Sequence, residues 1–191
     1  MPTLAPQATL ASASAQRRAT RRMSGFTLVE LMVTIAVASV ALSIAVPSFN
    51  QLIVTNRLAA QANEVVAALN FARSEAIKRN TTVTFCRVNP ASPSVCAAQA
   101  GNWLNWIITP GGGNVVRRGV VNTFSGGISV QSTLTGDQVM FGPEGLARTG
   151  GVIVNNQRIS ICSPNAQNGR RVVLGSGSRL STSPFTGSCG P

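Results

Sequence analysis

The chain has 191 residues, a formal net charge of +11, and neither histidine nor tyrosine. General acid–base groups are therefore scarce, no Ser or Cys nucleophile has a His partner, and no CxxC spacing suggests a metal site. The composition argues against an enzyme, a cofactor, a metal centre or a small-molecule substrate, and it favours structural or binding functions.

A basic segment stands directly before a long apolar run near the N-terminus. The basic residues are Arg17, Arg18, Arg21 and Arg22. No charged residue occurs from Leu31 to Asn56. The stretch from Phe26 to Val46 would form about 31 Å of helix, which is enough to cross a bilayer.

Three hypotheses fit this pattern. They are a cleavable secretory signal ending at Ser43-Ile44-Ala45, a plain single-pass anchor, and a prepilin segment that is cut between Gly25 and Phe26. Glu30 argues against the first two, because an acidic side chain in hydrocarbon costs about 2.5–3.5 kcal/mol on insertion scales. A chain that keeps such a carboxylate needs a partner for it.

The residues from Gly25 to Leu31, Gly-Phe-Thr-Leu-Val-Glu-Leu, resemble the processing site of type IV prepilins. The resemblance implies that a prepilin peptidase cuts after Gly25 and methylates the new N-terminus at Phe26. It also implies that Glu30 serves assembly by meeting the N-terminal amine of a neighbouring subunit. Residues 1–25 would then be a cleaved basic leader, longer than is usual for such proteins.

The arginines before the apolar run favour a cytoplasmic N-terminus. We therefore expect a single pass through the bacterial inner membrane, with the C-terminal domain in the periplasm, before the chain enters a pilus or pseudopilus. Four cysteines fit that oxidising compartment and allow three pairings. We expect Cys86–Cys96, which closes a Pro-rich loop, and Cys162–Cys189, which holds the C-terminal tail.

Helical periodicity continues beyond the apolar run. Apolar residues recur at spacings of four and three: Leu58, Ala62, Val65, Leu69, Ala72 and Ala76. One helix is predicted from Phe26 to about Arg79, with Pro47 kinking or locally melting it. Residues 26–47 would lie in the membrane or fibre core, and residues 48–80 would pack on the globular domain. Glu75 lies off the stripe, at a favourable spacing from Arg79.

From Thr81 onward, short strand-like segments alternate with turn residues. The candidate strands are Thr82–Val88, Trp103–Thr109, Val115–Val121, Ile128–Gln131, Gln138–Phe141, Val152–Val154, Ile159–Cys162 and Arg171–Leu174. Asn155-Asn156 is predicted as a hairpin turn. The expected fold class is α+β and pilin-like: a long N-terminal α-helix packed on antiparallel β-sheet, stabilised by disulfides, with residues 81–191 as the β-rich periplasmic domain.

The globular half is similar to the GspH/FimT family. The similar segments are Trp103–Ile108, the turn Phe141-Gly142-Pro143-Glu144-Gly145, and the strands Ile159–Cys162 and Gly169–Leu174. This resemblance implies a structural minor pilin of type IV pili or a minor pseudopilin of type II secretion. Its partners would be other pilins, and its role would be to prime or cap the fibre.

One branch of that family binds DNA through a Gly-Arg-x-Arg motif near the C-terminus. The matching place here reads Ser178-Arg179-Leu180-Ser181, so Arg179 remains, and Arg170 and Arg171 are further candidates one strand earlier. Four of the 16 Lys and Arg residues lie in the leader. From Ser48 onward there are 12 basic residues and four carboxylates, and this excess of positive charge suits binding to polyanions. DNA binding for natural transformation is thus one alternative function, and a secreted β-domain adhesin with a cleaved signal peptide is another.

Overall fold

The structure is a computed structural model, and it describes residues 25–111, 113–121, 127–163 and 168–190. The four leader arginines lie outside these ranges. The chain divides into two compact units, residues 1–43 and 44–191. A single helix, α1 (Leu28–Arg79), begins in the first unit and ends in the second.

The second half of α1 buries the predicted apolar stripe. All six stripe residues, from Leu58 to Ala76, are at most 2% exposed. The backbone stays helical through Pro47, so the local melting that was one expected outcome there does not occur. Glu75 is only 8% exposed, so its predicted place away from the packed face is wrong, although its predicted pairing with Arg79 is confirmed at 2.6 Å.

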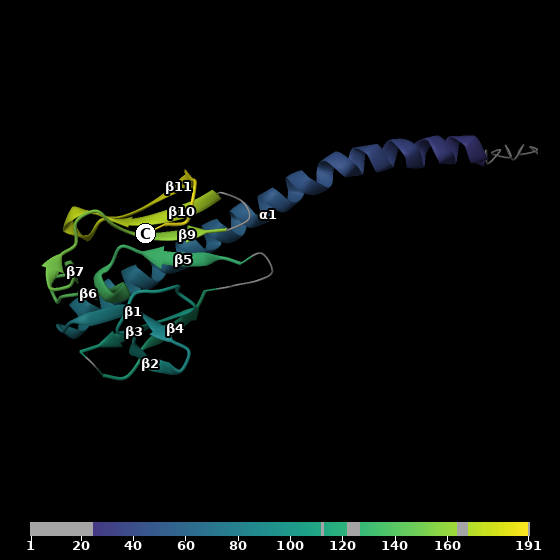
Figure 1. The fold of residues 1–191 in the computed structure, drawn as a ribbon. Coiled ribbons are helices and arrows are strands. Elements are labelled where there is room, and N and C mark those ends of the chain that lie inside the picture. Colours follow the sequence, from purple (N-terminus) through teal and green to yellow (C-terminus); the bar gives the residue numbers. More distant parts are fainter. Residues whose placement is uncertain (1–24, 112, 122–126, 164–167, 191) are drawn as a thin grey trace, which may run out of the picture. The chain divides into compact units, whose positions relative to one another are not determined.

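Two antiparallel sheets follow the helix in the second unit (Figure 1). Sheet A has the strand order β4-β3-β1-β6-β7-β8, and β2 pairs with β1 beside this path. Its strands are β1 (Val83–Asn89), β2 (Ser92–Cys96), β3 (Asn105–Pro110), β4 (Arg117–Val120), β6 (Gln138–Phe141), β7 (Ala147–Thr149) and β8 (Val152–Ile153).

Sheet B has the strand order β11-β10-β9-β5. Its strands are β5 (Ser129–Ser132), β9 (Gln157–Cys162), β10 (Asn168–Leu174) and β11 (Leu180–Thr186). Two short 3-10 helices, Thr135–Asp137 and Ser176–Ser178, stand at the ends of strands and join neighbouring elements. The predicted α+β class is confirmed.

One hydrophobic core is shared by α1 and both sheets. It combines the helix stripe with inward-facing residues of sheet A, such as Phe85, and of sheet B, such as Val172. The Phe85 ring lies 5.4 Å from Trp103 and 5.3 Å from Trp106, measured between centroids. Both tryptophans are 1% exposed, so they lie in the core rather than at a binding surface.

The eight predicted strands all overlap observed ones, but the predicted hairpin at Asn155-Asn156 is wrong. The strand before it, β8, pairs with β7 in sheet A, whereas β9 after it pairs with β10 and β5 in sheet B. The pair therefore forms a crossing between sheets, and Asn156 adopts φ 54°, a conformation that Asn tolerates. Gly150 and Gly151, with positive φ, form the tight turn in the β7–β8 hairpin.

Candidate functional site

The first turn of α1 carries a helix cap. The Thr27 side-chain hydroxyl accepts a hydrogen bond from the Glu30 backbone N–H at 3.2 Å, and the Leu31 N–H bonds to the Thr27 carbonyl at 3.2 Å. Thr-x-x-Glu is the residue pattern of a capping box, in which the side chain at the cap satisfies an unpaired N–H of the first turn. The cap fixes the start of the helix and so places Glu30 in its first turn, where the positive end of the helix dipole favours a carboxylate.

Gly25 and Phe26 precede this cap in non-helical, exposed backbone. The Phe26 side chain is 84% exposed. A Cβ added at Gly25 would meet no atom of the described residues within 4 Å, so they place no steric demand on this residue. The bond between them is therefore accessible to a protease.

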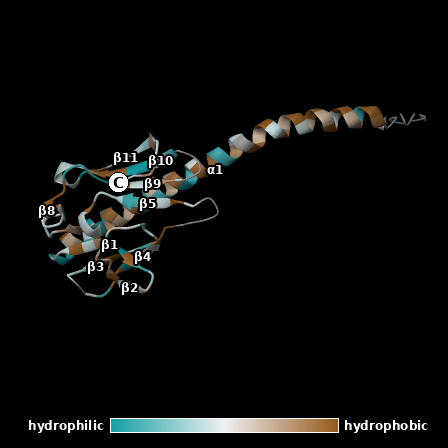
Figure 2. Cartoon of the chain, in the orientation of Figure 1, coloured by the Kyte–Doolittle hydropathy of each residue, from teal (hydrophilic) through white to brown (hydrophobic). Residues whose placement is uncertain are grey.

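The segment of α1 after Glu30 is coloured mostly as hydrophobic in Figure 2. From Leu31 to Val46 the large apolar side chains are all more than half exposed. Three hydroxyl residues interrupt this segment, and each donates to a carbonyl three residues earlier: Thr34 to Leu31, Ser39 to Ala36, and Ser43 to Val40. Hydroxyls satisfied in this way can lie in hydrocarbon at low cost, because they leave no donor unpaired.

α1 is long and apolar enough, by length and composition, to cross a membrane. Within the described residues, no donor side chain contacts the Glu30 carboxylate. The first part of α1 therefore has an uncharged apolar surface, and Glu30 at its start is the one carboxylate there, without a partner among the described residues.

Both expected disulfides are present in the structure. Cys86 pairs with Cys96 and Cys162 with Cys189, with Cα–Cα distances of 5.5 and 5.7 Å. The first joins β1 to the end of β2. The second ties the C-terminal tail to Cys162, the last residue of β9, which pairs with Ser129 of β5.

Three of the four carboxylates in the second unit are held in ion pairs: Glu75, Asp137 and Glu144. The hydrogen bond from Arg79 is the main reason why the pKa of Glu75 lies below its ordinary value. The pKa of Glu144 is lowered first by a backbone hydrogen bond and then by the bond from Arg148. Both shifts favour the charged form of Glu75 and Glu144, whereas a general acid needs a raised pKa.

The three arginines considered for DNA binding do not form one cluster. Arg170 and Arg171 follow each other on β10 and so point to opposite faces of sheet B. Arg170 shares its face with the core residue Val172 and lines a groove of about 380 Å³ with Leu58 of α1. Arg179 is exposed and lies at the other end of β10, four register positions from Arg171, or roughly 13 Å along the strand.

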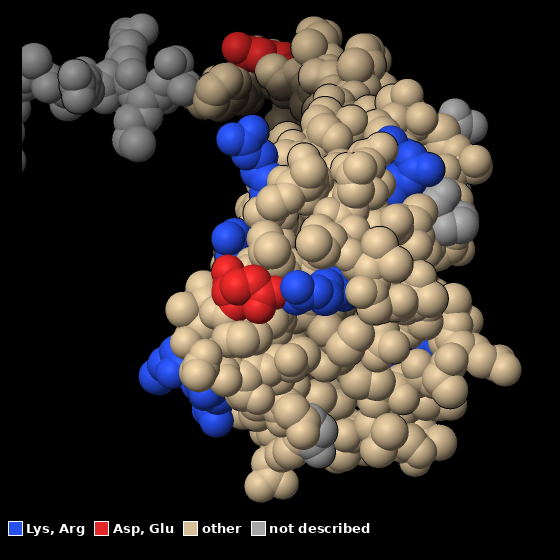
Figure 3. Space-filling view, turned by 90° about the vertical axis from the view of Figure 1, so that its left-hand side faces the viewer, with Lys and Arg blue, Asp and Glu red and all other residues tan. Residues whose placement is uncertain are grey.

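Basic side chains are also dispersed on the face of the molecule drawn in Figure 3. They stand there as separate groups, and one group touches acidic side chains. A continuous basic stripe, the usual footprint of a nucleic-acid interface, is not visible on that face.

The Phe141–Gly145 segment forms the turn between β6 and β7. The Gly145 N–H bonds to the Gly142 carbonyl at 2.8 Å, and Gly145 adopts φ 77°. A Cβ on Gly145 would lie 3.0 Å from the Ile77 side chain of α1, so the turn needs glycine both for its conformation and for its contact with the helix.

Ser178 stands where the DNA-binding branch has glycine. Its φ of 61° is one that glycine adopts at no cost. The serine is 2% exposed, and its hydroxyl accepts a hydrogen bond from the Ala147 N–H at 2.6 Å, while its carbonyl accepts one from Arg73 at 3.4 Å. Ser178 therefore joins the β10–β11 connection to β7 and to α1, a structural role that the sequence did not reveal.

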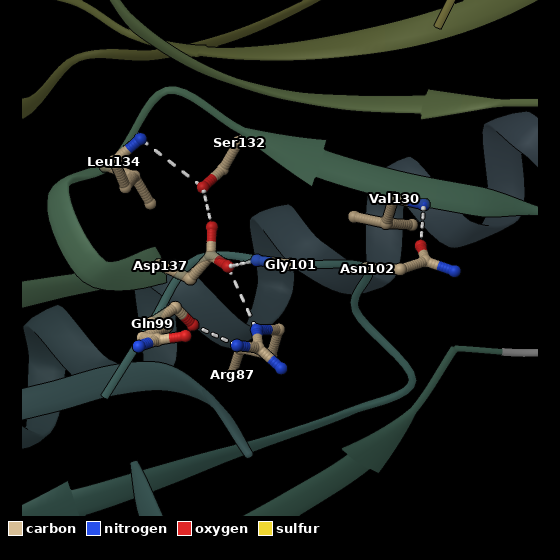
Figure 4. A network of polar contacts seen from close by, with 8 residues as sticks. All are labelled: Arg87, Gln99, Gly101, Asn102, Val130, Ser132, Leu134 and Asp137. Atoms are coloured by element: carbon tan, nitrogen blue, oxygen red, sulfur yellow. Dashed lines mark hydrogen bonds and ion pairs between the residues drawn. The ribbon is translucent and has the colours of Figure 1, made fainter. Parts of the chain in front are cut away.

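A polar network around Asp137 was also missed (Figure 4). Asp137 is 1% exposed and accepts hydrogen bonds from Arg87 Nε at 2.9 Å, Gly101 N–H at 2.7 Å and Ser132 Oγ at 2.6 Å. Next to it, the Asn102 side chain accepts a bond from the Val130 N–H at 3.2 Å. The network ties the loop before β3 to β1 of sheet A and β5 of sheet B, so it is structural.

Comparison with solved structures finds crystal structures of the type IV minor pilin FimU of Pseudomonas aeruginosa. One matches with 17% identity over 68% of this chain and 90% of that chain, at a TM-score of 0.49. A second crystal form matches with 18% identity over 66% of this chain and 93% of that chain, at a TM-score of 0.47. No curated protein matches the chain.

Two family models match the sequence. The prokaryotic N-terminal methylation motif matches residues 20–46, which include Gly25, Phe26 and Glu30. The model for the type II transport protein GspH matches residues 61–178, more than half of the chain. The chain therefore belongs to the GspH family, and it is a minor pilin or pseudopilin of the GspH/FimT type.

Proposed function

We propose that this protein is made as a prepilin, anchored in the inner membrane, and then assembled into a type IV pilus or a type II secretion pseudopilus. A prepilin peptidase removes residues 1–25 and methylates Phe26. The N-terminus faces the cytoplasm, residues 81–191 fold in the periplasm, and the protein primes or caps the fibre together with other pilins.

The observation that carries this proposal is the exposed apolar part of α1 with its single unpaired carboxylate. Apolar side chains that are more than half exposed, such as Leu31 and Val40, must be covered by lipid or by other helices. Glu30 cannot be neutralised inside its own chain by any described residue, because none contacts its carboxylate. The amine of a neighbouring subunit would supply the missing charge, so that Glu30 favours assembly over the isolated membrane-bound state.

Replacing Glu30 tests this role directly. Glu30→Gln keeps the size of the side chain and removes the charge, so membrane insertion should be unchanged or improved, since the polar cost falls. Incorporation into sheared fibres, measured by immunoblot against the membrane pool, should fall at least tenfold if one charge pair stabilises assembly by about 1.4 kcal/mol or more.

Glu64→Gln is the matched control. Glu64 is a half-buried carboxylate on the part of α1 that packs on the domain, and its variant should assemble normally. If Glu30→Gln and the parent protein enter fibres equally well, the assembly role of Glu30 is refuted.

Gly25 allows a second test, which separates processing from folding. A Cβ at Gly25 meets no atom of the described residues, so Gly25→Val should leave the fold intact. The valine should still block cleavage, because it stands at the proposed recognition position. A Gly25→Val protein that is cut as efficiently as the parent would contradict recognition at this residue.

DNA binding receives less support from the structure than from the sequence. Arg170, Arg171 and Arg179 are divided between two faces and two ends of β10, and Ser178 and Ser181 replace the remaining motif residues. Affinity for nucleic acid rises with the number of phosphates neutralised together, so separated arginines give weak, salt-sensitive binding. We therefore keep fibre assembly as the proposed function.

A further inference from the structure

The outer face of sheet B, turned away from the core, carries hydrogen-bond donors and no acid. The register of the four strands sets one row across it, consisting of Gln131, Ser160, Arg171 and Ser183. The next row adds Arg158, opposite Val173, and Ser181. Neighbouring strands are about 4.8 Å apart, so these rows present an amide, hydroxyls and two guanidinium groups at regular short spacings.

Arg171 is held in place at the centre of this face. Its guanidinium carbon lies 4.4 Å from the centroid of the Phe185 ring. That ring in turn lies across Gly169, where a Cβ would overlap it. Stacking of this kind holds the planar guanidinium in one orientation. Its Nε is buried, so a planar, two-oxygen acceptor would meet the two terminal nitrogens.

Two polar atoms in the central row are buried without a hydrogen-bond partner among the described residues. They are the Nε of Arg171 and the Oγ of Ser160, which face each other as direct cross-strand neighbours. Buried polar atoms in folded proteins are nearly always bonded, so this row keeps hydrogen-bonding capacity that no described residue uses. Ser160 is 0% exposed, so it lies beneath the surface of the face and supports Arg171 from below. Arg158, Ser181 and Ser183 beside them are exposed and can be reached by a ligand.

The charge of the surroundings selects an anion. The sequence contains no Asp or Glu from Gly145 to its end, and none on β5, so sheet B has no carboxylate of its own. An arginine fork binds a carboxylate with two parallel hydrogen bonds, and serine hydroxyls can bond the hydroxyls that neighbour it on a sugar.

We propose that the outer face of sheet B binds a carboxylated polysaccharide, with Arg171 holding a uronate carboxylate and the exposed Arg158, Ser181 and Ser183 lining the site. Nucleic acid fits this face less well. Single strands need an open aromatic surface for stacking, and Phe185, the sole aromatic residue on the strands of sheet B, is already stacked on Arg171 and packed on Gly169. Duplex binding needs more cations than two arginines supply.

The test uses the mature full-length protein in detergent micelles. Binding of polygalacturonate is measured by calorimetry at about 150 mM salt, where screening weakens unspecific charge effects. Neutral dextran of similar length and a single-stranded oligonucleotide are measured in parallel. We expect saturable binding of polygalacturonate and none of dextran.

The variants locate the site on one face of the sheet. Arg171→Ala should weaken polygalacturonate binding about tenfold or more, since it removes a two-bond charged contact. Arg170→Ala removes the same charge one residue away on the opposite face, and it should bind like the parent. Arg171→Lys keeps the charge and the side-chain stem but not the fork, so a clear loss of affinity in this variant supports the site even where the alanine variant folds poorly.

Three outcomes would overturn the proposal. They are the absence of polygalacturonate binding, an equal loss in the Arg170 and Arg171 variants, and tighter binding of the oligonucleotide with the same dependence on Arg171. The last outcome would assign the face to nucleic acid. None of them bears on fibre assembly through α1, which uses different residues.

Discussion

The Asp137 network is the point where one substitution should do most harm to the globular domain. Asp137 is 1% exposed and accepts hydrogen bonds from three donors, and its partner Arg87 has a side chain that is only 13% exposed. Removing one member of a buried ion pair leaves the other charge uncompensated, which costs about 3–5 kcal/mol. We therefore expect Asp137→Ala to lower the free energy of unfolding by about that amount.

A second variant separates charge from backbone conformation. Asp137 has φ 52°, which alanine disfavours but asparagine tolerates. Asp137→Asn keeps the shape and the turn, yet it loses the charge that serves Arg87, so its cost should be about 1.5–3 kcal/mol, as for hydrogen bonds to charged groups.

The measurement is urea unfolding of the purified protein in micelles, followed by tryptophan fluorescence. Trp103 and Trp106 are both buried beside this region, so they report its exposure to solvent. Glu144→Ala, which removes an exposed ion pair with Arg148, is the control and should have a much smaller effect. An Asp137→Ala protein as stable as the Glu144 variant would refute the account of the network.

Three further predictions concern other positions. Ser178→Ala should lower the free energy of unfolding by about 1–3 kcal/mol in the same urea assay, because the buried Ala147 N–H loses its acceptor. Ser178→Gly should lower it less, since glycine relieves the strained φ. Equal stability of the parent and both variants would contradict this. Gly119→Val should displace the Trp106 ring, which a Cβ there would overlap, and an unchanged near-ultraviolet circular dichroism spectrum would show that the ring does not lie there. Glu75 has a pKa below its ordinary value of 4.5, so its contribution to stability is complete above that pH and is lost as the pH falls through the lower folded value. The parent should therefore lose more stability than Glu75→Gln between neutral pH and acid below 4.5, and parallel stability curves would be evidence against the pairing.

The long helix and most strands were predictable because their signals are local. The spacing of Leu58 to Ala76 is read directly as a helix face, and the alternation in β1 and β9 as strands. Three strands were missed for equally local reasons. β7 has three residues, whereas β2 and β11 contain Pro93 and Pro184 and mostly exposed polar residues, so none shows the alternation of a half-buried strand.

The parts of the site that depend on sheet register could not be predicted. Arg170 and Arg171 are neighbours in sequence, but strand geometry sends them to opposite faces, and only the pairing of β10 with β9 shows that Arg171 lies opposite Ser160. Asp137 meets Arg87 across a separation of 50 residues. The start of α1, by contrast, is encoded in consecutive residues, so Gly25, Phe26 and Glu30 can be proposed from the sequence as processing and assembly residues, and these roles stay predictions.

The most direct test of the central claim is the mass of the mature chain isolated from membranes of the producing bacterium, with its N-terminal peptide sequenced by fragmentation. The account predicts a chain that begins at Phe26, carries one added methyl group on its amine, and retains the apolar helix. A mature chain that begins at Val46, with the helix removed by a signal peptidase, would contradict the account of anchoring and assembly.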